Sequence, residues 1–451
     1  MFRLDSNIEI TDELIKELIE KHCTKREDRL RKYYDGEHDI LKRTFDDETK
    51  PNNKIVTNFC QSIANSSVGY FIGKPVSYSC HDKGYMEKLQ EIFDLNDEQQ
   101  VNASLADSAS ICSYGVEILY TKTNKFNELE IRFDDLDLSE QKVVLVYDRS
   151  VEKNLFMAIR YYDFKDIASD SETTEIFVYT ADAIYQYQKI DGVLELIEEE
   201  LHYFGEVPIN PYFNKNNKGD FEDVITLNDA YNLLQSDDIN ESNYSNDAYL
   251  LIKGMIADDT EISKMKEKRV IELDDDGQAE WLIKDINDTW KENLKTRIKT
   301  DIHTIAAVPD LSDSSFGGTQ TGEAMKYKLK AFEDNRVKKE RLFKQAIQRR
   351  IRLITNILNK QGNQYDWRDV VPRFTANLPK SDLTIEDIIK LVGIGLVSKE
   401  TARTLIAAIE DPGDEAEKIE REKEESIDLD NLPPEDDEEN QDEIDDKEEI
   451  E

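Results

Sequence analysis

The stretch PDLSDSSFGGTQTGEAMKYKLKAFEDNRVKKERLFKQAIQRRIRLI, residues 309–354, decides how the rest of the chain is organised. It joins a loop rich in Ser, Gly and Thr to a long helical pattern, and Pro309 ends the apolar helical run before it. From Glu323 to Lys360 there is no Gly or Pro, so we expect one helix of roughly ten turns. Its buried face is predicted by apolar residues that recur at helical spacings. They are Leu329, Phe332, Phe343, Ile347, Ile351, Ile354 and Leu358.

The other face of this helix is basic. Residues 323–360 hold 12 Lys or Arg and 4 Asp or Glu, a local charge of +8 in a chain of formal net charge -40. Long helices often carry these bases because Lys and Arg favour helix and their stems cover apolar surface. A single base therefore has an ordinary structural explanation, whereas the clustering of twelve favours contact with negative charge.

Composition bounds the rest of the chain. A length of 451 residues predicts about two to four domains, and a hydrophobic content of 38% is enough to build buried cores. A pI near 4.5 argues against non-specific wrapping of nucleic acid or anionic membrane, because the mean field repels phosphate. Much of the charge is local, since residues 410–451 hold 23 acids and 4 bases, a net -19. We expect this acidic tail to be disordered.

The cysteines and apolar segments give no sign of secretion, metal binding or membrane insertion. Four cysteines lie far apart without a C-x-x-C pair, which predicts reduced thiols in a cytoplasmic setting. Two of them adjoin a histidine, at 22–23 and 80–81, but neighbouring residues rarely bind one ion together, and we expect no metal and no cofactor. No apolar signal follows Met1, and the apolar run at 388–397 is too short to span a bilayer.

Before the long helix, the chain divides into a helical part and a β part. We expect helices at 11–35, with Thr11 as the N-cap, at 57–71 and at 96–114. From 115 to 204 the apolar period becomes two, and seven short segments predict six or seven strands of an antiparallel sheet. After Pro211 the pattern is helical again. Its nearly all-polar continuation to residue 247 is typical of a helix that bridges domains or packs against copies of itself.

A small insertion with strand character follows at 249–284. Its segments VIEL and AEWLIK flank Asp274, Asp275, Asp276 and Gly277, which predicts a hairpin turn. Three aspartates also suggest a calcium loop, but the alternating spacing of such loops is missing, and we favour the turn. Another helix then leads to Pro309, with apolar residues repeating every three or four positions from 286 to 305.

The order helix, small β insertion, helix, loop, long helix is unusual. Together with several motifs it resembles the portal proteins of tailed bacteriophages, in the branch found in long-tailed phages of Gram-positive bacteria. The matching motifs are YYDGEHDI at 33–40, NKIVTNF at 53–59, GYFIGKPVSY at 69–78, DAYNLLQSD at 229–237 and PDLSDSSFGGTQTGEAMKYKL at 309–329. The resemblance covers nearly the whole chain to about residue 412, and the last motif is the most specific.

The resemblance implies an α+β portal fold with an α/β wing, a two-helix stem, a small β-containing clip, a long tunnel helix and an α-helical crown. The clip would face the packaging motor. In family terms the expected domains are the wing at 1–220, the first stem helix at 221–248, the clip at 249–285, the second stem helix at 286–308, the tunnel loop at 309–322, the tunnel helix at 323–360, a return segment of the wing at 361–381, the crown at 382–412 and the acidic tail at 413–451.

The resemblance also implies a structural, non-enzymatic function. A portal ring, usually of about twelve subunits in the virion and about thirteen in some isolated forms, nucleates procapsid assembly at one vertex. Double-stranded DNA passes through it non-specifically during packaging and ejection. The implied partners are the terminase large subunit, the scaffold, the major capsid protein and a head-completion or adaptor protein. The expected location is the portal vertex of the virion, after assembly in the host cytoplasm.

A channel for a moving duplex needs weak, repeated phosphate contacts and not fixed base contacts. We expect Lys326, Lys330 and Arg336 to approach DNA. Three further bases are at least as well explained by ion pairs with acids of the neighbouring subunit. They are Arg349, Arg350 and Arg352. The flexible tunnel loop would let subunits take different conformations around the duplex. Its residues are Ser312, Asp313, Ser314, Ser315, Phe316, Gly317, Gly318, Thr319, Gln320 and Thr321.

Other functions fit the sequence less well. Gly317 and Gly322 have the glycine spacing of an ATPase phosphate loop, but Glu323 and Ala324 stand where Lys and Ser or Thr are needed. No G-x-S-x-G or H-E-x-x-H motif points to a hydrolase or nuclease. A head-tail adaptor or minor capsid protein without a DNA channel remains the alternative. The acidic tail fits either a solvating role inside the capsid or contact with scaffold or capsid proteins.

Overall fold

The computed structural model divides the chain into two compact units, residues 1–377 and 378–451. The residues that it describes are 2–5, 7–47, 50–165, 172–190, 192–245, 249–253, 263, 277–282, 288–310, 322–377, 385–406, 409, 413, 415–416 and 418–422. Three expected features lie outside the described residues: the loop at 311–321, the turn at 274–276 and the acidic tail beyond 422.

Two short helices stand where the sequence predicts a single N-terminal helix. α1 (Asp12–Lys21) is capped by Thr11, whose hydroxyl accepts the backbone N–H of Leu14 at 3.3 Å. The chain is extended at His22, whose Nδ1 lies 3.0 Å from the hydroxyl of Tyr161, and α2 (Lys25–Tyr34) follows. The interruption between α1 and α2 thus coincides with a contact to a distant strand, and the local sequence periodicity does not reveal that contact.

The remaining N-terminal elements are η1 (Asp39–Lys42), α3 (Phe59–Ile72), β2 (Ser77–Ser79), α4 (Lys83–Leu95) and α5 (Glu98–Cys112). The sequence predicts both ends of α3 and of α5 to within two residues, but it did not predict α4. The α4 and α5 helices are separated by Asn96 and Asp97, and Asp97 takes the left-handed φ of 47° that short polar residues tolerate. This tight turn joins α4 to α5 directly, with only Asn96 and Asp97 between them.

All seven predicted strand segments form strands, but they divide between two sheets. The seven are β3 (Tyr114–Thr123), β4 (Leu129–Asp135), β5 (Lys142–Tyr147), β6 (Leu155–Lys165), β7 (Glu172–Tyr179), β8 (Ala183–Ile190) and β9 (Val193–Leu201). The sequence did not predict β1 (Phe2–Arg3) and β10 (Ile209–Phe213), which complete the two sheets. The larger sheet has the order β1-β5-β6-β7-β8-β9 and the smaller one β10-β3-β4. The pairing of β1 with β5 is parallel, and the other pairs in these sheets are antiparallel.

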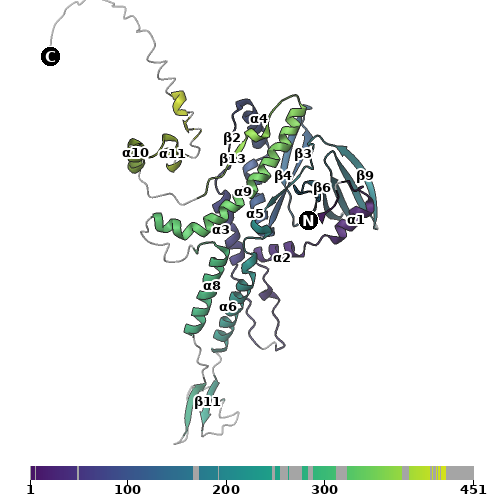
Figure 1. Cartoon of the computed structure of the whole chain (residues 1–451). Helices are drawn as coiled ribbons and strands as arrows, with labels where there is room; N and C mark the ends of the chain where they lie inside the picture. Colours follow the sequence, from purple (N-terminus) through teal and green to yellow (C-terminus); the bar gives the residue numbers. More distant parts are fainter. Residues whose placement is uncertain are drawn as a thin grey trace, which may run out of the picture. The chain divides into compact units, whose positions relative to one another are not determined.

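The larger sheet is covered on both faces. On one face Ile15 and Leu18 of α1 belong to a core with Val144 and Met157 (Figure 1). Residues that alternate with these along the strands, such as Leu145, pack in a second core with apolar residues of β3 and β10. The alternation along each strand therefore serves two cores, because side chains of successive residues point to opposite faces.

Two antiparallel helices and a pair of antiparallel strands follow the sheets (Figure 1). The elements are η2 (Lys215–Asn217), η3 (Glu222–Val224), α6 (Ile225–Ser245), β11 (Tyr249–Lys253), β12 (Gln278–Leu282) and α8 (Asp288–Ala306). The β11 and β12 strands pair antiparallel. Residues of the predicted strand VIEL lie outside the described residues, and AEWL of the second predicted strand belongs to β12, whose partner is β11.

The polar residues of α6 bind the strap, which we define as residues 41–57. Asn228 donates to the carbonyl of Thr57 at 2.8 Å, and Asn232 accepts from the N–H of Thr57 at 2.8 Å. The hydroxyl of Ser236 accepts from the N–H of Ile55 at 2.9 Å. One helical turn further on, Asn240 accepts from the N–H of Asn53 at 2.9 Å. Asn228 and Asn232 thus bind the same strap residue. From Asn232 to Asn240 the helix residues are four apart and their backbone partners are two apart.

The spacing along the helix and the spacing along the strap cover nearly the same distance. Four residues of helix rise about 6.0 Å, and two residues of extended chain rise about 6.6 Å. The ladder therefore stays in register along about two turns of α6. We expected this polar helix to bridge domains or to pack against copies of itself, and the structure instead gives its buried polar groups partners in the same chain.

α9 (Gly322–Lys360) begins and ends within one residue of the prediction. It bends along its length (Figure 1), although no Gly or Pro interrupts it. Phe332 packs in one core with α3, α8 and the start of α6, whereas Phe343, Ile347 and Ile354 pack in another core with α4, α5 and the smaller sheet. The two parts of the helix thus follow different cores.

The chain then returns to the N-terminal part. After α9 come η5 (Trp367–Asp369) and β13 (Val371–Arg373), which pairs antiparallel with β2. The second unit holds α10 (Ile385–Gly393) and α11 (Lys399–Leu405), the latter capped by Ser398. Within the parts of the chain that the structure describes, no helix combines the length and apolar character that crossing a bilayer requires.

Candidate functional site

The basic helix α9 has one exposed face, and some of its bases lie there. Among the side chains that the structure describes between 327 and 345, the exposed ones are Tyr327, Lys330, Ala331, Asp334, Lys338, Arg341 and Gln345. At about 100° per residue these seven positions fall within a sector of roughly 100°. Phe332, Lys339 and Arg350 point to the opposite, buried side. Lys330, Lys338 and Arg341 therefore form a basic stripe, a name we keep below.

Arg336 lies away from this stripe and is held by acids of its own helix. Its guanidinium pairs with Glu333 at 2.7 Å and with Glu340 at 2.9 Å. The hydroxyl of Tyr70 on α3 donates to Glu333 at 2.7 Å, and the Tyr70 ring stacks on Phe332 with centroids 4.3 Å apart. The guanidinium holds the pKa of Glu333 below its ordinary value. Arg336 thus fixes α9 to α3 through this acid.

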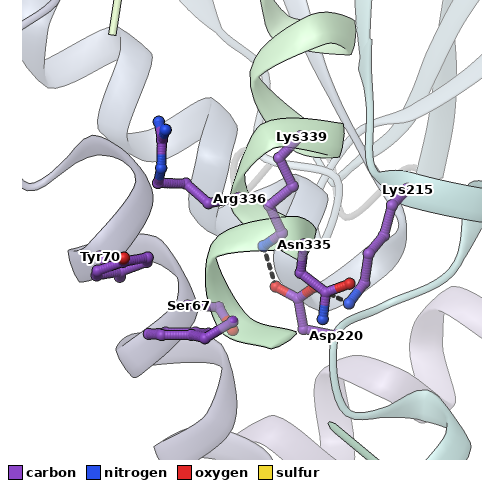
Figure 2. Close-up of a pocket in the computed structure, with 8 residues that line it drawn as sticks. Ser67, Tyr70, Lys215, Asp220, Asn335, Arg336 and Lys339 are labelled. Carbon is purple, nitrogen blue, oxygen red and sulfur yellow. Dashed lines mark hydrogen bonds and ion pairs between the residues drawn. The ribbon is translucent and has the colours of Figure 1, made fainter. Parts of the chain in front are cut away.

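Lys339, three residues further on, is buried against the loop that leads into α6 (Figure 2). Its ammonium pairs with Asp220, which also accepts the hydroxyl of Ser110 at 2.6 Å and the amide of Asn214 at 3.1 Å. Burial alone would raise the pKa of Asp220. The positive charges of Lys339 and Lys215 outweigh the effect of burial, so the pKa of Asp220 lies below its ordinary value. This cluster ties α9 to α5 and to the start of α6.

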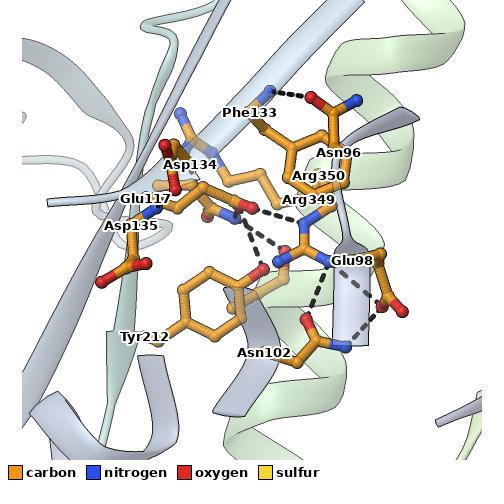
Figure 3. A network of polar contacts seen from close by, with 12 residues as sticks. Asn96, Glu98, Asn102, Glu117, Phe133, Asp134, Asp135, Tyr212, Arg349 and Arg350 are labelled. Atoms are coloured by element: carbon orange, nitrogen blue, oxygen red, sulfur yellow. Dashed lines mark hydrogen bonds and ion pairs between the residues drawn. The ribbon is translucent and has the colours of Figure 1, made fainter. Parts of the chain in front are cut away.

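Arg350 is the most deeply buried charge of α9, with a relative exposure of 0% (Figure 3). It pairs with Glu117 of β3 at 2.5 Å and with Glu98 of α5 at 3.3 Å, and donates to Asn102 at 2.8 Å. Burial raises the pKa of Glu117, against the opposing effect of Arg350. Its guanidinium also lies 4.5 Å from the ring centroid of Phe133. One arginine thereby joins a helix, a strand and α9.

The neighbouring arginines also have partners in the same chain. Arg349 donates to the carbonyls of Ile209 and Val207 at 2.6 and 2.7 Å, and burial lowers its pKa. Arg352 pairs with Glu206 at 2.7 Å. These partners lie in the same chain, whereas we expected acids of a neighbouring subunit to pair with Arg349, Arg350 and Arg352. The acids come from the segment before β10, from β3 and from α5, which sequence spacing does not bring together.

The predicted site residues fall into three groups. The tunnel-loop residues 312–321 and the turn residues Asp274, Asp275 and Asp276 lie outside the described residues, and Gly277 directly precedes β12. Lys326 belongs to α9, but its side chain is outside the described part. Lys330 is exposed and Arg336 is paired. Among the described residues no group of three His, Cys, Asp or Glu could hold a metal ion.

Lys338 and Arg341 were not singled out from the sequence. The signal was present, because positions 330, 334, 338, 341 and 345 repeat at spacings of four and three with only polar side chains. A helical wheel centred on the polar residues, in place of the apolar ones, finds the stripe. Because the bases were counted without a helical wheel, Arg336 was grouped with Lys330 as a DNA-facing residue, although the two lie on different faces of α9.

Comparisons with known proteins agree on one family. The family described as "Phage portal protein, SPP1 Gp6-like" matches residues 15–429. A curated relative, the "Portal protein" of Bacillus phage SPP1, is 24% identical over 447 residues, which cover 91% of this chain and 86% of the relative. The match therefore spans both units and includes all of α9.

Proposed function

The chain belongs to the SPP1 Gp6-like family of phage portal proteins, and from that premise we propose how its parts divide the work of a portal. A portal protein is a structural, non-enzymatic subunit of an oligomeric ring at one capsid vertex, and DNA enters and leaves the head through that ring. Its partners are DNA, the phage head and the terminase. Membership of this family excludes the alternative, a head-tail adaptor or minor capsid protein without a DNA channel.

The division of labour follows the order of the elements. We assign residues 1–220 and 361–381 to the wing, α6 and α8 to the stem and residues 249–285 to the clip. The assignment is supported by the β11–β12 pair, which joins the far ends of the two stem helices. Residues 309–322 are the tunnel loop and α9 the tunnel helix. α10 and α11 belong to the crown at 382–412, and the acidic tail follows from 413.

The basic stripe is the part of α9 best placed to meet DNA. Its bases are exposed, whereas the buried bases of α9 are engaged in the ion pairs described above. Lysine and arginine on an exposed helix face give weak, sequence-independent contacts with phosphate, which let a duplex slide. Of the three residues expected near DNA, Lys330 belongs to this stripe and Lys326 precedes it by one turn. Arg336 acts by holding the helix in place.

The finer partner assignments complete the proposal. The ring holds about twelve subunits in the virion and about thirteen in isolated form. The clip docks the terminase large subunit during packaging and the head-completion protein afterwards. Scaffold and major capsid protein bind during assembly in the host cytoplasm.

The observation that carries this proposal is the family match over residues 15–429. The test is native mass spectrometry of the purified full chain, with end-on electron-microscope class averages of the same sample. A ring of about twelve or thirteen copies with a central hole wide enough for a duplex of roughly 20 Å supports the proposal. A chain that stays monomeric or dimeric with scaffold added, at every salt concentration, would contradict it.

A further inference from the structure

The strap, α6 and α8 form one layer. Ser236 and Asn240 of α6 bind the strap, whereas Asp238 pairs with Lys291 and Lys295 of α8 at 3.0 and 2.5 Å. Position 238 is two residues, or about 200° of helical turn, from both 236 and 240. The strap and α8 therefore lie on opposite sides of α6 (Figure 1).

The two outer sides of this layer carry large exposed apolar side chains. Three of them on the strap are 37–42% exposed: Leu41, Phe45 and Ile55. On α8, Trp290 is 59% exposed. Single exposed apolar residues are ordinary on a protein surface, but here three lie on one outer side of the layer and Trp290 lies on the opposite side. Exposed charges of opposite sign accompany them. They are Asp46 on the strap and Arg297 on α8.

Both patches lie at the same height along α6. Arg43 of the strap pairs with Asp237 at 2.7 Å and lies 4.9 Å from the ring centroid of Phe45. The next residue of α6, Asp238, pairs with Lys291, which directly follows Trp290. Phe45 and Trp290 are therefore both within about one helical turn of the same level of α6. A rotation about an axis along these helices would bring one patch opposite the other in the next copy.

A closed ring requires such a pair of different surfaces, because each subunit contacts one neighbour on either side and the contacts are heterologous. We propose that the face of α8 around Trp290 binds the strap of the adjacent copy around Phe45 and Ile55, with Arg297 facing Asp46. This inference rests on the ring of the proposed function. The polar ladder of α6 then has a second role, because it holds the strap in the position that the neighbouring copy binds.

The experiment is disulfide trapping in the full chain. Cys23 and Cys80 are first replaced by Ser, because their thiols are not fully buried and could form other disulfides. Cys60 and Cys112 are buried and are left in place. Phe45→Cys and Trp290→Cys are then combined in one chain, and the reduced protein is checked for rings by native mass spectrometry. After mild oxidation, non-reducing gels are expected to show a ladder of covalent oligomers up to the full ring. A mixture of the two single-cysteine chains is expected to give dimers and no higher species, because each chain then offers one partner thiol.

The matched control combines Trp290→Cys with Val151→Cys, a position in the β5–β6 connection that is 98% exposed. At least a tenfold higher crosslinked fraction is expected for the Phe45 pair than for this control. Rings that form normally but give no ladder above the control would overturn the proposed contact and leave the portal function standing. Dimers that appear with Trp290→Cys alone would also overturn it, because they require a symmetric contact. A chain that forms no ring at all would overturn the proposed function instead.

Discussion

Replacing Arg350 with Met is expected to destabilise the first unit strongly. The change keeps most of the side-chain volume but leaves two carboxylates, Glu117 and Glu98, without the cation that both contact. Glu117 is fully buried, and among the described residues it then keeps the amide of Asn210 at 2.8 Å and the hydroxyl of Tyr212 at 3.1 Å as donors. Removing one partner of a buried pair typically costs about 3–5 kcal/mol. We expect about 4 kcal/mol in the free energy of unfolding at neutral pH.

The cost is expected to shrink as the pH falls. Burial raises the pKa of Glu117 even with Arg350 present, and without the arginine that pKa rises further. A carboxyl whose folded pKa lies above its unfolded value of about 4.3 stabilises the fold only when protonated. Its penalty is therefore largest at neutral pH and declines as the pH falls through the folded pKa. Urea denaturation of the full chain, followed by fluorescence and circular dichroism at pH 7.5 and 5, measures both effects.

Two further variants make the result interpretable. Arg368→Met removes an arginine whose side chain is largely exposed, and we expect a change within about 0.5 kcal/mol. The double variant Glu117→Gln, Arg350→Met removes the stranded charge, and its cost is expected to fall below the sum of the single costs by at least about 1 kcal/mol. A cost below 1 kcal/mol for Arg350→Met, or strict additivity in the double variant, would refute the argument from buried charge.

Variants at three other places in the structure give further predictions. Asn232→Ala removes the acceptor of the Thr57 N–H and should cost about 1–3 kcal/mol, seen as faster protease cleavage within the strap. Replacing the whole basic stripe by Gln should leave the ring mass unchanged but lower the yield of DNase-protected DNA in packaging, and the loss should grow with salt. Asp220, whose folded pKa lies below its unfolded value of about 3.9, stabilises the fold above that value and less as the pH falls through the folded pKa. Asp220→Asn should therefore flatten the acid side of the stability profile, measured by urea midpoints between pH 2.5 and 6.

The long helix shows what the sequence determines. Its ends are set by Gly322 and by the Gln361-Gly362 break, and its apolar spacing identifies Phe343, Ile347 and Ile354 as core residues, as the structure confirms. These are local properties of a 39-residue helix. The break between α1 and α2 is not local, because His22 contacts Tyr161 from a distant strand. Periodicity therefore predicted one helix where there are two.

The polar and charged contacts were harder to predict than the apolar ones. Asn232 and Ser236 look solvent-exposed in a polar helix, because nothing near them in sequence shows that an extended strap binds alongside. Arg350 looks like one more base on a basic face, yet its partner Glu117 is 233 residues away. A helical wheel does separate Arg350 from Lys330. It does not show what lies opposite each residue, since that depends on the packing of the whole chain.

The central claim is that the exposed basic stripe of α9 faces DNA in the portal ring. It is tested most directly by photocrosslinking in DNA-filled heads. A photoreactive amino acid replaces Lys330 in one protein and Val151, which is also exposed but on the β5–β6 connection, in the other. The account predicts that irradiation attaches packaged DNA to position 330 and not to position 151. Heads that are filled with DNA but show no crosslink from position 330 above that from position 151 would contradict it.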